Sequence, residues 1–349
     1  MLKKIKIILI FFVLAIIVSV YFIIKPYYEF LTTDLSISPI KILLSDNSLK
    51  KVEDSVNVLV LGIAGGQHDG PNLSDSILVF RYNFKTNHLT TIGIPRDIWS
   101  DTLKDKINTA YAYGEAKQED GGLKLAKAEV GAILGISIQY SAVINFNKFK
   151  ELIDYLGGID VNVEHALIDK KFPIEGKEND LCGGDTEYKC RYETLTFNEG
   201  TMFMDGKTAL KFTRSRNAQG DEGSDFARSR RQQLVISAIK SKVIEIVKNN
   251  DIEKIKKLYQ KADSLVNRDV SNQEVAIMFK DIVFSKNYSQ RNVFLPEDLF
   301  IVPNYADYDN KYVLIPAENF DVIHQFVLCL FEKEDEDTCL KLNKVEKKE

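Results

Sequence analysis

The sequence predicts an α/β fold: a single α-β-α layered domain with a mixed central sheet, preceded by one N-terminal transmembrane helix. Two observations lead to this prediction. Apolar runs typical of strands alternate with amphipathic runs typical of helices after residue 52, which is the pattern of layered α/β domains. Residues 5–24 form a run of twenty residues whose one charge is Lys6, and a helix of that length spans a bilayer.

Charges around residues 5–24 predict the orientation of this helix. Lys3, Lys4 and Lys6 lie at its start, whereas Glu29 and Asp34 follow it, so the short N-terminus is expected in the cytoplasm and the main domain outside a cell membrane crossed once. A cleaved signal peptide is the alternative. Its apolar part would be shorter and followed by small residues, so an uncleaved anchor is favoured.

The four cysteines form two near pairs, Cys182 with Cys190 and Cys329 with Cys339. A disulfide closing a loop of this size stabilises by about 2–3 kcal/mol in the loop-entropy model. Zinc is the competing interpretation, but neither spacing is C-x-x-C and no histidine lies within a short loop of either pair. The prediction is two disulfides in an oxidising compartment.

Composition divides the chain into four parts. Residues 1–24 are the cytoplasmic tip and anchor, 25–51 a juxtamembrane connector, 52–330 one extracytoplasmic domain without a Pro/Gly/Ser-rich linker, and 331–349 a charged tail. Within the last hundred residues, a strand over 311–316 is expected to complete the sheet.

The first strands of the domain converge on one edge. Residues 56–63 read as a buried strand that runs into a glycine-rich turn over 62–71, and residues 76–83 and 89–94 read as a hairpin. An antiparallel hairpin brings Asp75 and the segment 95–97 to its open end. If the first strand runs parallel to 89–94, its glycine turn arrives there too, and ligand sites gather at such strand ends.

Farther along, helices and strands alternate. Helices are expected over 121–134 and 147–156 and strands over 138–146 and 159–163, with residues 164–195 forming an excursion over the surface.

Five arginines and no lysine lie between residues 214 and 231, although the whole chain carries a net charge of −4. Arginine presents a planar fork of donors that matches phosphate oxygens two at a time. The cluster is therefore a local device for binding a phosphate, made by Arg214, Arg216, Arg228, Arg230 and Arg231.

Helical phase separates these arginines. Residues 226–248 carry an apolar stripe that includes Val235 and Ile246, and Arg228, Arg231 and Gln232 share its face while Arg230 points away as a solvated residue. An inward guanidinium has to meet a carboxylate or an anionic ligand. The carboxylates nearby are Asp221, Glu222 and Asp225, and because the arginines outnumber them, a ligand is favoured over an internal salt bridge.

Taken in order, these landmarks resemble the LytR-CpsA-Psr proteins of bacterial cell envelopes. The matching segments are VNVLVLGI at 56–63, SDS at 74–76, IPRD at 94–97, KINTAYAYG at 106–114, LGGIDV at 156–161, MDGKTAL at 204–210 and the arginine cluster through Gln232-Gln233. Their combined order covers about residues 52–245 and is highly specific.

The resemblance implies a membrane-anchored phosphotransferase that moves a glycan from a polyprenyl pyrophosphate lipid to a peptidoglycan hydroxyl. It implies that Asp75 binds Mg²⁺ or Mn²⁺ and that a clamp holds the pyrophosphate. Asp97, after Arg96, is a possible base, although an aspartate there is as often a structural partner of the arginine. Lys106 and Asn108 match a further family motif. The residues implied for the clamp are Arg96, Arg214, Arg216, Arg228, Arg231 and Gln232.

The sequence departs from the family at the turn after the first strand. The family carries a second acidic metal ligand where this chain has Ala64. Asp69 or His68 in the rewritten turn is the candidate replacement, while an ordinary turn aspartate is the competing interpretation.

Two other functions remain open. One is hydrolysis of the same pyrophosphate, with water as the acceptor. The other is a non-catalytic anchor that binds anionic glycans at the cell surface, as a regulator or scaffold. Nucleic-acid binding is not supported, because stacking aromatics do not alternate with the arginines.

Overall fold

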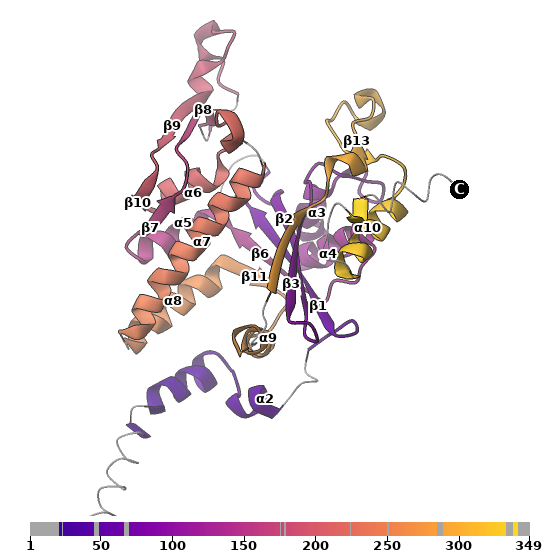
Figure 1. Ribbon diagram of the computed structural model, residues 1–349. Coiled ribbons are helices and arrows are strands. Elements are labelled where there is room, and N and C mark those ends of the chain that lie inside the picture. The colour runs from indigo at the N-terminus through magenta and orange to yellow at the C-terminus, as the bar shows by residue number, and fades with distance from the viewer. Residues whose placement is uncertain are drawn as a thin grey trace, which may run out of the picture.

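The protein is described by a computed structural model. It describes residues 21–22, 24–44, 49–65, 70–174, 176–177, 179–223, 225–249, 251–284, 289–332 and 338–340. Within this part of the chain the layered α/β architecture expected from the sequence is present, with a mixed sheet at its centre (Figure 1).

Six strands form the central sheet in the order β11-β6-β1-β2-β3-β12. β1 pairs antiparallel with β2 and β2 with β3, while β6 runs parallel to β1 and β12 parallel to β3. The predicted strands 56–63, 76–83 and 89–94 are thus confirmed, and the first and third run in the same direction. The strands are β1 (Ser55–Ile63), β2 (Ser74–Asn83), β3 (His88–Gly93), β6 (Tyr140–Asn145), β11 (Val266–Arg268) and β12 (Ser289–Phe294).

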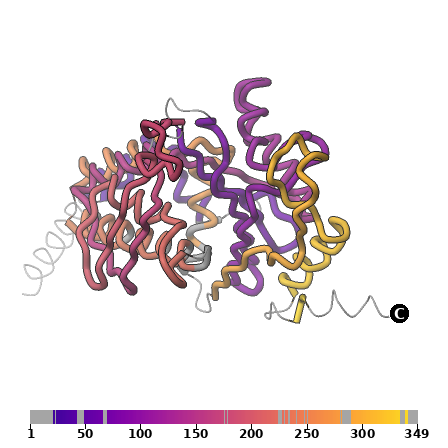
Figure 2. The backbone as a smooth tube through the Cα atoms, turned by 90° about the horizontal axis from the view of Figure 1, so that it is seen from above, coloured from indigo at the N-terminus to yellow at the C-terminus, as the bar shows by residue number. Residues whose placement is uncertain are grey.

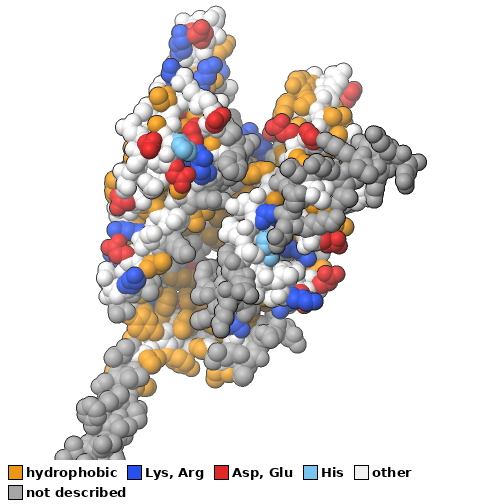
Figure 3. Space-filling model, viewed as in Figure 1, with side chains coloured by type: hydrophobic (Ala, Val, Ile, Leu, Met, Phe, Trp, Pro, Cys, Tyr) orange, Lys and Arg blue, Asp and Glu red, His pale blue; other side chains and the backbone are white. Residues whose placement is uncertain are grey.

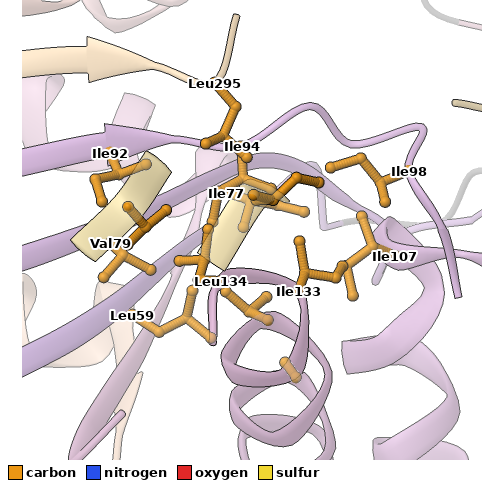
Figure 4. Close-up of a cluster of buried hydrophobic side chains, with 14 of the residues drawn as sticks. Leu59, Ile77, Val79, Ile92, Ile94, Ile98, Ile107, Ile133, Leu134 and Leu295 are labelled. Atoms are coloured by element: carbon orange, nitrogen blue, oxygen red, sulfur yellow. The ribbon is translucent and has the colours of Figure 1, made fainter. Parts of the chain in front are cut away.

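On one side of the sheet lie α3 (Ala110–Lys117), α4 (Gly121–Leu134) and α10 (Phe320–Glu332) (Figures 1 and 2). α4 has the predicted bounds and ends at Gly135, whose left-handed conformation suits a residue without a Cβ. Aliphatic side chains from the sheet, the loops after it and α4 interlock in the main core, including Leu59, Ile92 and Leu134 (Figure 4). This core fixes the strand ends that carry the candidate site.

A second body packs on the other side of the sheet around its own apolar cluster (Figures 1 and 2). Val235 and Ile246 of α7 are buried in this cluster, which confirms the apolar stripe predicted for residues 226–248. Its elements are α5 (Phe146–Tyr155), α6 (Gly206–Arg214), α7 (Asp225–Lys248), α8 (Ile252–Leu265), β7 (Ile159–Val163), β8 (Leu167–Pro173), β9 (Tyr192–Phe197) and β10 (Gly200–Met204).

Two predictions about secondary structure are wrong in their details. Residues 164–195 are more than a surface excursion, because β8 pairs with β9 and Leu167 and Leu195 are buried in the second cluster. Residues 311–316 add no strand to the central sheet. Their end forms β14 (Ile315–Pro316), which pairs with β13 (Phe300–Ile301), while β11 and β12 supply the outer strands of the sheet.

The described N-terminal residues dock beneath the sheet. Asn272 and Gln273 of α9 (Asn272–Phe284) hydrogen-bond Leu35 O and Ser38 N, next to the short helix α2 (Pro39–Leu44). The predicted membrane span, 5–24, lies almost wholly outside the described residues. Among those that are described, no helix has the length and apolarity needed to cross a bilayer.

Both predicted disulfides are present, Cys182–Cys190 and Cys329–Cys339. Their surroundings differ. Cys339 is fully buried in the main core, where Cys329 also packs, whereas Cys182 and Cys190 are half-buried on the outer projection beyond β8 and β9.

Removing the two disulfides is expected to have unequal effects. Replacing Cys329 and Cys339 with serine should lower the free energy of global unfolding by about 2–4 kcal/mol, because the bridge ties the end of α10 to the core. The matched Cys182/Cys190 double variant should lose less than about 1 kcal/mol, since its loop can open locally. Denaturant unfolding measured side by side checks this, and equal losses would contradict it.

Candidate functional site at the strand ends

Three strands end and a fourth begins at the upper edge of the sheet, at the opposite end from α2 (Figure 1). β1, β3 and β6 end here and β2 begins here, because Ile63 faces Ser74 on one side and Asn145 on the other. The segment 95–97 follows β3 directly. The hairpin geometry predicted from the sequence therefore holds, and it places polar side chains from distant parts of the chain at one edge.

Asp75, Arg96 and Asp97 form a contact chain at this edge. Arg96 Nη1 donates to Asp75 Oδ1, and Arg96 Nε lies 3.6 Å from Asp97 Oδ2. Lys106 Nζ donates to Asp97 Oδ1 at 2.7 Å. All four side chains are partly exposed, so they remain accessible to a ligand while each cation has a carboxylate partner. Asp97 meets both Arg96 and Lys106, which matches the alternative of a structural partner better than a free base.

Asn108 lies beside this chain. Its backbone N–H donates to Arg96 O at 3.3 Å, and its side-chain Oδ1 is buried and accepts no hydrogen bond within the described part of the chain. A buried oxygen without a donor is costly in a folded protein. Asn108 thus offers an unsatisfied oxygen next to the backbone that carries Arg96.

The turn after β1 approaches the neighbouring strand closely. Ala64 is buried, and Gly65 adopts φ +67° and donates its N–H to Pro71 O. A Cβ on Gly65 would lie 2.2 Å from the Asn145 amide, so side chains are excluded at this position. Asp69 and His68, the candidate replacements for the acidic ligand missing at Ala64, lie outside the described residues.

Arg214 reaches the same edge from the second body. It is the last residue of α6, it is exposed, and its guanidinium lies 6.0 Å from the centroid of the Phe146 ring. Phe146 follows β6 directly and packs against β1, where a Cβ on Gly62 would lie 2.6 Å from its ring. Arg214 therefore stands beside the ends of β1 and β6, across the edge from Asp75 and Arg96.

The other predicted members of the clamp lie on the α6–α7 side of the site. Arg216 is exposed two residues beyond the end of α6, and Arg228 and Gln232 are half-buried on α7. The structure thus brings Asp75, Arg96 and Asp97 into contact. It sets Arg214, at the end of α6, beside the neighbouring strand end. A ligand bound by both Arg96 and Arg214 would connect these two parts of the site.

Arg231 is placed differently. Its side chain is 2% exposed, and it donates to Phe212 O at 3.1 Å, Ser215 O at 2.7 Å, Glu222 O at 2.9 Å and Glu222 Oε2 at 3.0 Å. Burial lowers the pKa of this guanidinium, and the Glu222 carboxylate counteracts that effect. Arg231 therefore forms an internal salt bridge with Glu222. This is the alternative to ligand binding that the sequence allows for an inward-facing arginine.

A second buried group holds the same segment from the opposite side. Asp169 of β8 is 0% exposed, and its Oδ2 accepts from Ser215 Oγ at 2.6 Å and from Asn217 N at 3.2 Å. Ser215 is therefore fixed between Asp169 and Arg231. Arg214 and Arg216, on either side of the buried Ser215, are both exposed. Sequence periodicity gave no signal for Asp169, which meets Ser215 only through the fold.

The prediction that Arg230 is a solvated surface residue is wrong. Its guanidinium is 29% exposed, forms an ion pair with Glu222 and lies 3.5 Å from Glu164. Helical phase separated Arg230 from Arg231 correctly, but Glu222 reaches both of them.

The sequence also missed a segment that borders the site. Residues 313–314 run alongside 97–99: Trp99 N donates to Leu314 O at 2.8 Å and Leu314 N to Asp97 O at 2.9 Å. This brings Lys311 to Asp105, with 2.8 Å between Nζ and Oδ1. Burial alone would raise the pKa of Asp105, but hydrogen bonds from Lys311 and Tyr113 outweigh it and hold that pKa below its ordinary value. Asp105 is therefore ionised at neutral pH.

The donor set at this edge fits a hard divalent cation shared with a phosphate. Mg²⁺ is usually held by one or two carboxylates together with phosphate oxygens, and Asp75 supplies one carboxylate while Asn108 offers an amide oxygen. Among the described residues, the one cluster of three metal-ligating types is Asp180 with Cys182 and Cys190. Those cysteines form a disulfide, so that cluster is not a metal site.

Comparison with known proteins gives matches over most of the chain. The LytR_cpsA_psr family model matches residues 32–305. A protein of Bacillus mycoides (strain KBAB4), named polyisoprenyl-teichoic acid--peptidoglycan teichoic acid transferase TagU, is 32% identical over 190 residues, which are 53% of this chain and 52% of that protein. The chain thus spans about half the length of the curated relatives it matches.

Solved structures share the fold. B. subtilis TagV superposes with a TM-score of 0.51 at 23% identity, covering 79% of this chain and 97% of that one. Protein gbs0355 from Streptococcus agalactiae gives 0.52 at 22% identity, covering 80% and 89%. The match of the family model over residues 32–305 confirms the predicted resemblance to the family.

Proposed function

Because this chain belongs to the LytR-CpsA-Psr family, we propose that it is a membrane-anchored, extracytoplasmic phosphotransferase. It moves a glycan phosphate from a polyprenyl pyrophosphate carrier to a hydroxyl of peptidoglycan. The observation that carries the proposal is the arrangement at one sheet edge of Asp75 and Arg96 with Arg214, which ends α6 beside Phe146 at the end of β6. The activity named for the TagU relatives supports it.

The reaction exchanges one phosphorus–oxygen bond for another. The acceptor hydroxyl oxygen bonds to the phosphorus that carries the glycan, and the bond from that phosphorus to the bridging oxygen breaks. Polyprenyl phosphate leaves, the hydroxyl proton passes to solvent, and a phosphodiester remains. Negative charge on the departing phosphate is what the site has to stabilise, and preorganised cations do this in the transition state.

Each residue has a part in this proposal. Arg96 and Arg214 approach the pyrophosphate from the two sides of this edge. Further contacts on the α6–α7 side come from Arg216, Arg228 and Gln232. Asp75 and the Asn108 oxygen would hold Mg²⁺ or Mn²⁺, which when bound would neutralise phosphate charge. Asp97 keeps Arg96 and Lys106 in place through its two ion pairs. Arg231 has an indirect part, because its hydrogen bonds to Phe212 O and Ser215 O hold the segment that carries Arg214 and Arg216.

Asp75→Asn is the variant that tests the metal part of the proposal. It keeps the shape of the side chain and removes the charge, so the Mg²⁺ concentration needed for half-maximal transfer should rise. For the same reason less Mn²⁺ should bind to the protein, as measured by electron paramagnetic resonance. Asp101→Asn, an exposed aspartate nearby on the same side of the domain, is the matched control. An unchanged metal requirement in Asp75→Asn would remove Asp75 from the metal site.

The test of the reaction type is product analysis. The full chain in proteoliposomes is given a polyprenyl pyrophosphate glycan and Mg²⁺, with and without peptidoglycan. Transfer predicts a glycan phosphodiester on peptidoglycan that appears only when the acceptor is present. Equal release of polyprenyl phosphate in both arms would indicate a hydrolase, and tight binding without turnover would indicate a non-catalytic anchor.

A further inference from the structure

Exposed tyrosines gather beside the candidate phosphate site. Tyr113, Tyr305 and Tyr312 are 43%, 47% and 47% exposed, and the rings of Tyr305 and Tyr312 meet edge to face with centroids 6.3 Å apart. We call these three side chains, with Asp105, Lys106 and Lys311 between them, the tyrosine patch. Figure 3 shows the surface notched between two projections at the top of the molecule. Tyr305, Lys311 and Tyr312 belong to the segment that follows β13, which forms one of these projections (Figure 1), whereas Asp105, Lys106 and Tyr113 come from the neighbouring segment that ends in α3.

The patch adjoins the site through Lys106. Its ammonium donates to Asp97 at 2.7 Å and lies 5.9 Å from the centroid of the Tyr312 ring. Asp97 in turn lies 3.6 Å from Arg96, which binds Asp75. Arg96 is therefore linked to the Tyr312 ring by three successive contacts, through Asp97 and Lys106.

The patch is held rigidly. Residues 97–99 and 313–314 are joined by backbone hydrogen bonds, and Trp99 packs edge to face on Tyr308 with centroids 4.9 Å apart. Asp105 is fixed by Lys311 at 2.8 Å and by the Tyr113 hydroxyl at 2.6 Å. Large rings on a rigid frame lose little conformational entropy when a ligand stacks on them.

We infer that the tyrosine patch is a sugar-binding subsite, which stacks the apolar face of a pyranose ring on Tyr312 or Tyr305 and hydrogen-bonds its hydroxyl groups to Lys106 and Lys311, while the buried Asp105 holds Lys311 and Tyr113 in place. This inference rests on the proposed function. In a glycosyl pyrophosphate the first sugar is bonded directly to the phosphate, so its ring has to lie beside the phosphate subsite. Alternation of aromatic faces with charged hydrogen-bonding groups suits a ring with one apolar face and a polar rim.

A membrane surface is a poor occupant for this patch. The docked N-terminal segment, which leads to the predicted anchor, lies at the opposite end of the molecule (Figure 1). Two members of the patch, Lys311 and Tyr312, lie beyond the family match, which ends at residue 305. Lys311 and Tyr312 are therefore features of this chain's own C-terminal region, as expected for residues that select among glycans.

The test compares binding of two probes to the full chain in detergent: polyprenyl pyrophosphate bearing N-acetylglucosamine, and polyprenyl pyrophosphate without a sugar. Tyr312→Ala should weaken binding of the sugar-bearing probe about tenfold and leave the sugar-free probe unchanged. Tyr312→Phe keeps the ring and should bind like the wild type. Tyr192→Ala, an exposed tyrosine on the other projection, is the matched control.

A third probe, a soluble peptidoglycan disaccharide, separates the two sources of the sugar. Weaker binding of the sugar-bearing lipid assigns the patch to the donor, and weaker binding of the disaccharide assigns it to the acceptor. No change with either probe, or an equal loss with the sugar-free lipid, would overturn the inference. Failure of transfer in the product analysis would overturn the proposed function and leave these binding differences intact.

Discussion

Replacing Arg231 with methionine is expected to lower the free energy of unfolding by about 3–5 kcal/mol. The substitution leaves the buried carbonyls of Phe212 and Ser215 without their donor and removes one of the two ion-pair partners of Glu222. A buried acceptor that loses its donor retains the full penalty of having left water. Denaturant unfolding of the full chain, followed by tryptophan fluorescence, measures the loss.

The control for this variant is Arg214→Met. Arg214 is exposed, so replacing it should change the free energy of unfolding by no more than about 0.5 kcal/mol. If the free energies of unfolding of Arg231→Met and Arg214→Met differed by less than about 1 kcal/mol, Arg231 would not stabilise the segment between α6 and α7. Glu222→Gln should fall between them, since glutamine keeps one oxygen that can accept a hydrogen bond but carries no charge.

Arg214→Met is expected to lower the rate of glycan transfer about 100-fold or more while leaving unfolding unchanged. Removal of one preorganised donor that faces developing charge has an effect of this size in other enzymes. Arg214→Lys should recover only part of the rate, because it restores the charge but not the planar fork. The measurement is single-turnover transfer from a polyprenyl pyrophosphate glycan at saturating acceptor.

Lys207→Met is the matched control for Arg214. Lys207 is an exposed cation near the start of the same helix, about two turns before Arg214, so its loss changes net charge equally without removing a member of the clamp. A rate for Arg214→Met within threefold of the Lys207→Met rate would remove Arg214 from the clamp. Together the Arg231 and Arg214 variants separate stability from transfer within one cluster.

Local patterns in the sequence predicted the elements that form the site. Alternation and turn residues located β1, β2 and β3, and their hairpin geometry brought Asp75 to Arg96. Helical phase correctly turned Arg231 inward. The sequence also named Glu222 among the candidate partners, and the structure shows this ion pair. The sequence could not supply the carbonyls of Phe212 and Ser215, because these reach Arg231 from α6 and the residue that follows it.

The features that sequence reasoning missed depend on contacts between distant segments. β12 has no clear alternation and is recognisable only by its pairing with β3. Leu314 pairs with residues 97–99 through backbone atoms, which leave no trace in side-chain pattern. Asp169 is buried by a strand pair in a region that was expected to be a surface excursion.

The central claim is that the Asp75 and Arg96 edge, with Arg214 beside it, transfers a glycan phosphate to peptidoglycan. The most direct test gives the full chain in proteoliposomes a radiolabelled polyprenyl pyrophosphate glycan, Mg²⁺ and peptidoglycan. The account predicts labelled peptidoglycan joined through a phosphodiester, with loss of that product in Arg214→Met and not in Lys207→Met. Label that stays on the lipid with the wild-type protein, or that passes to water whether or not peptidoglycan is present, would contradict it.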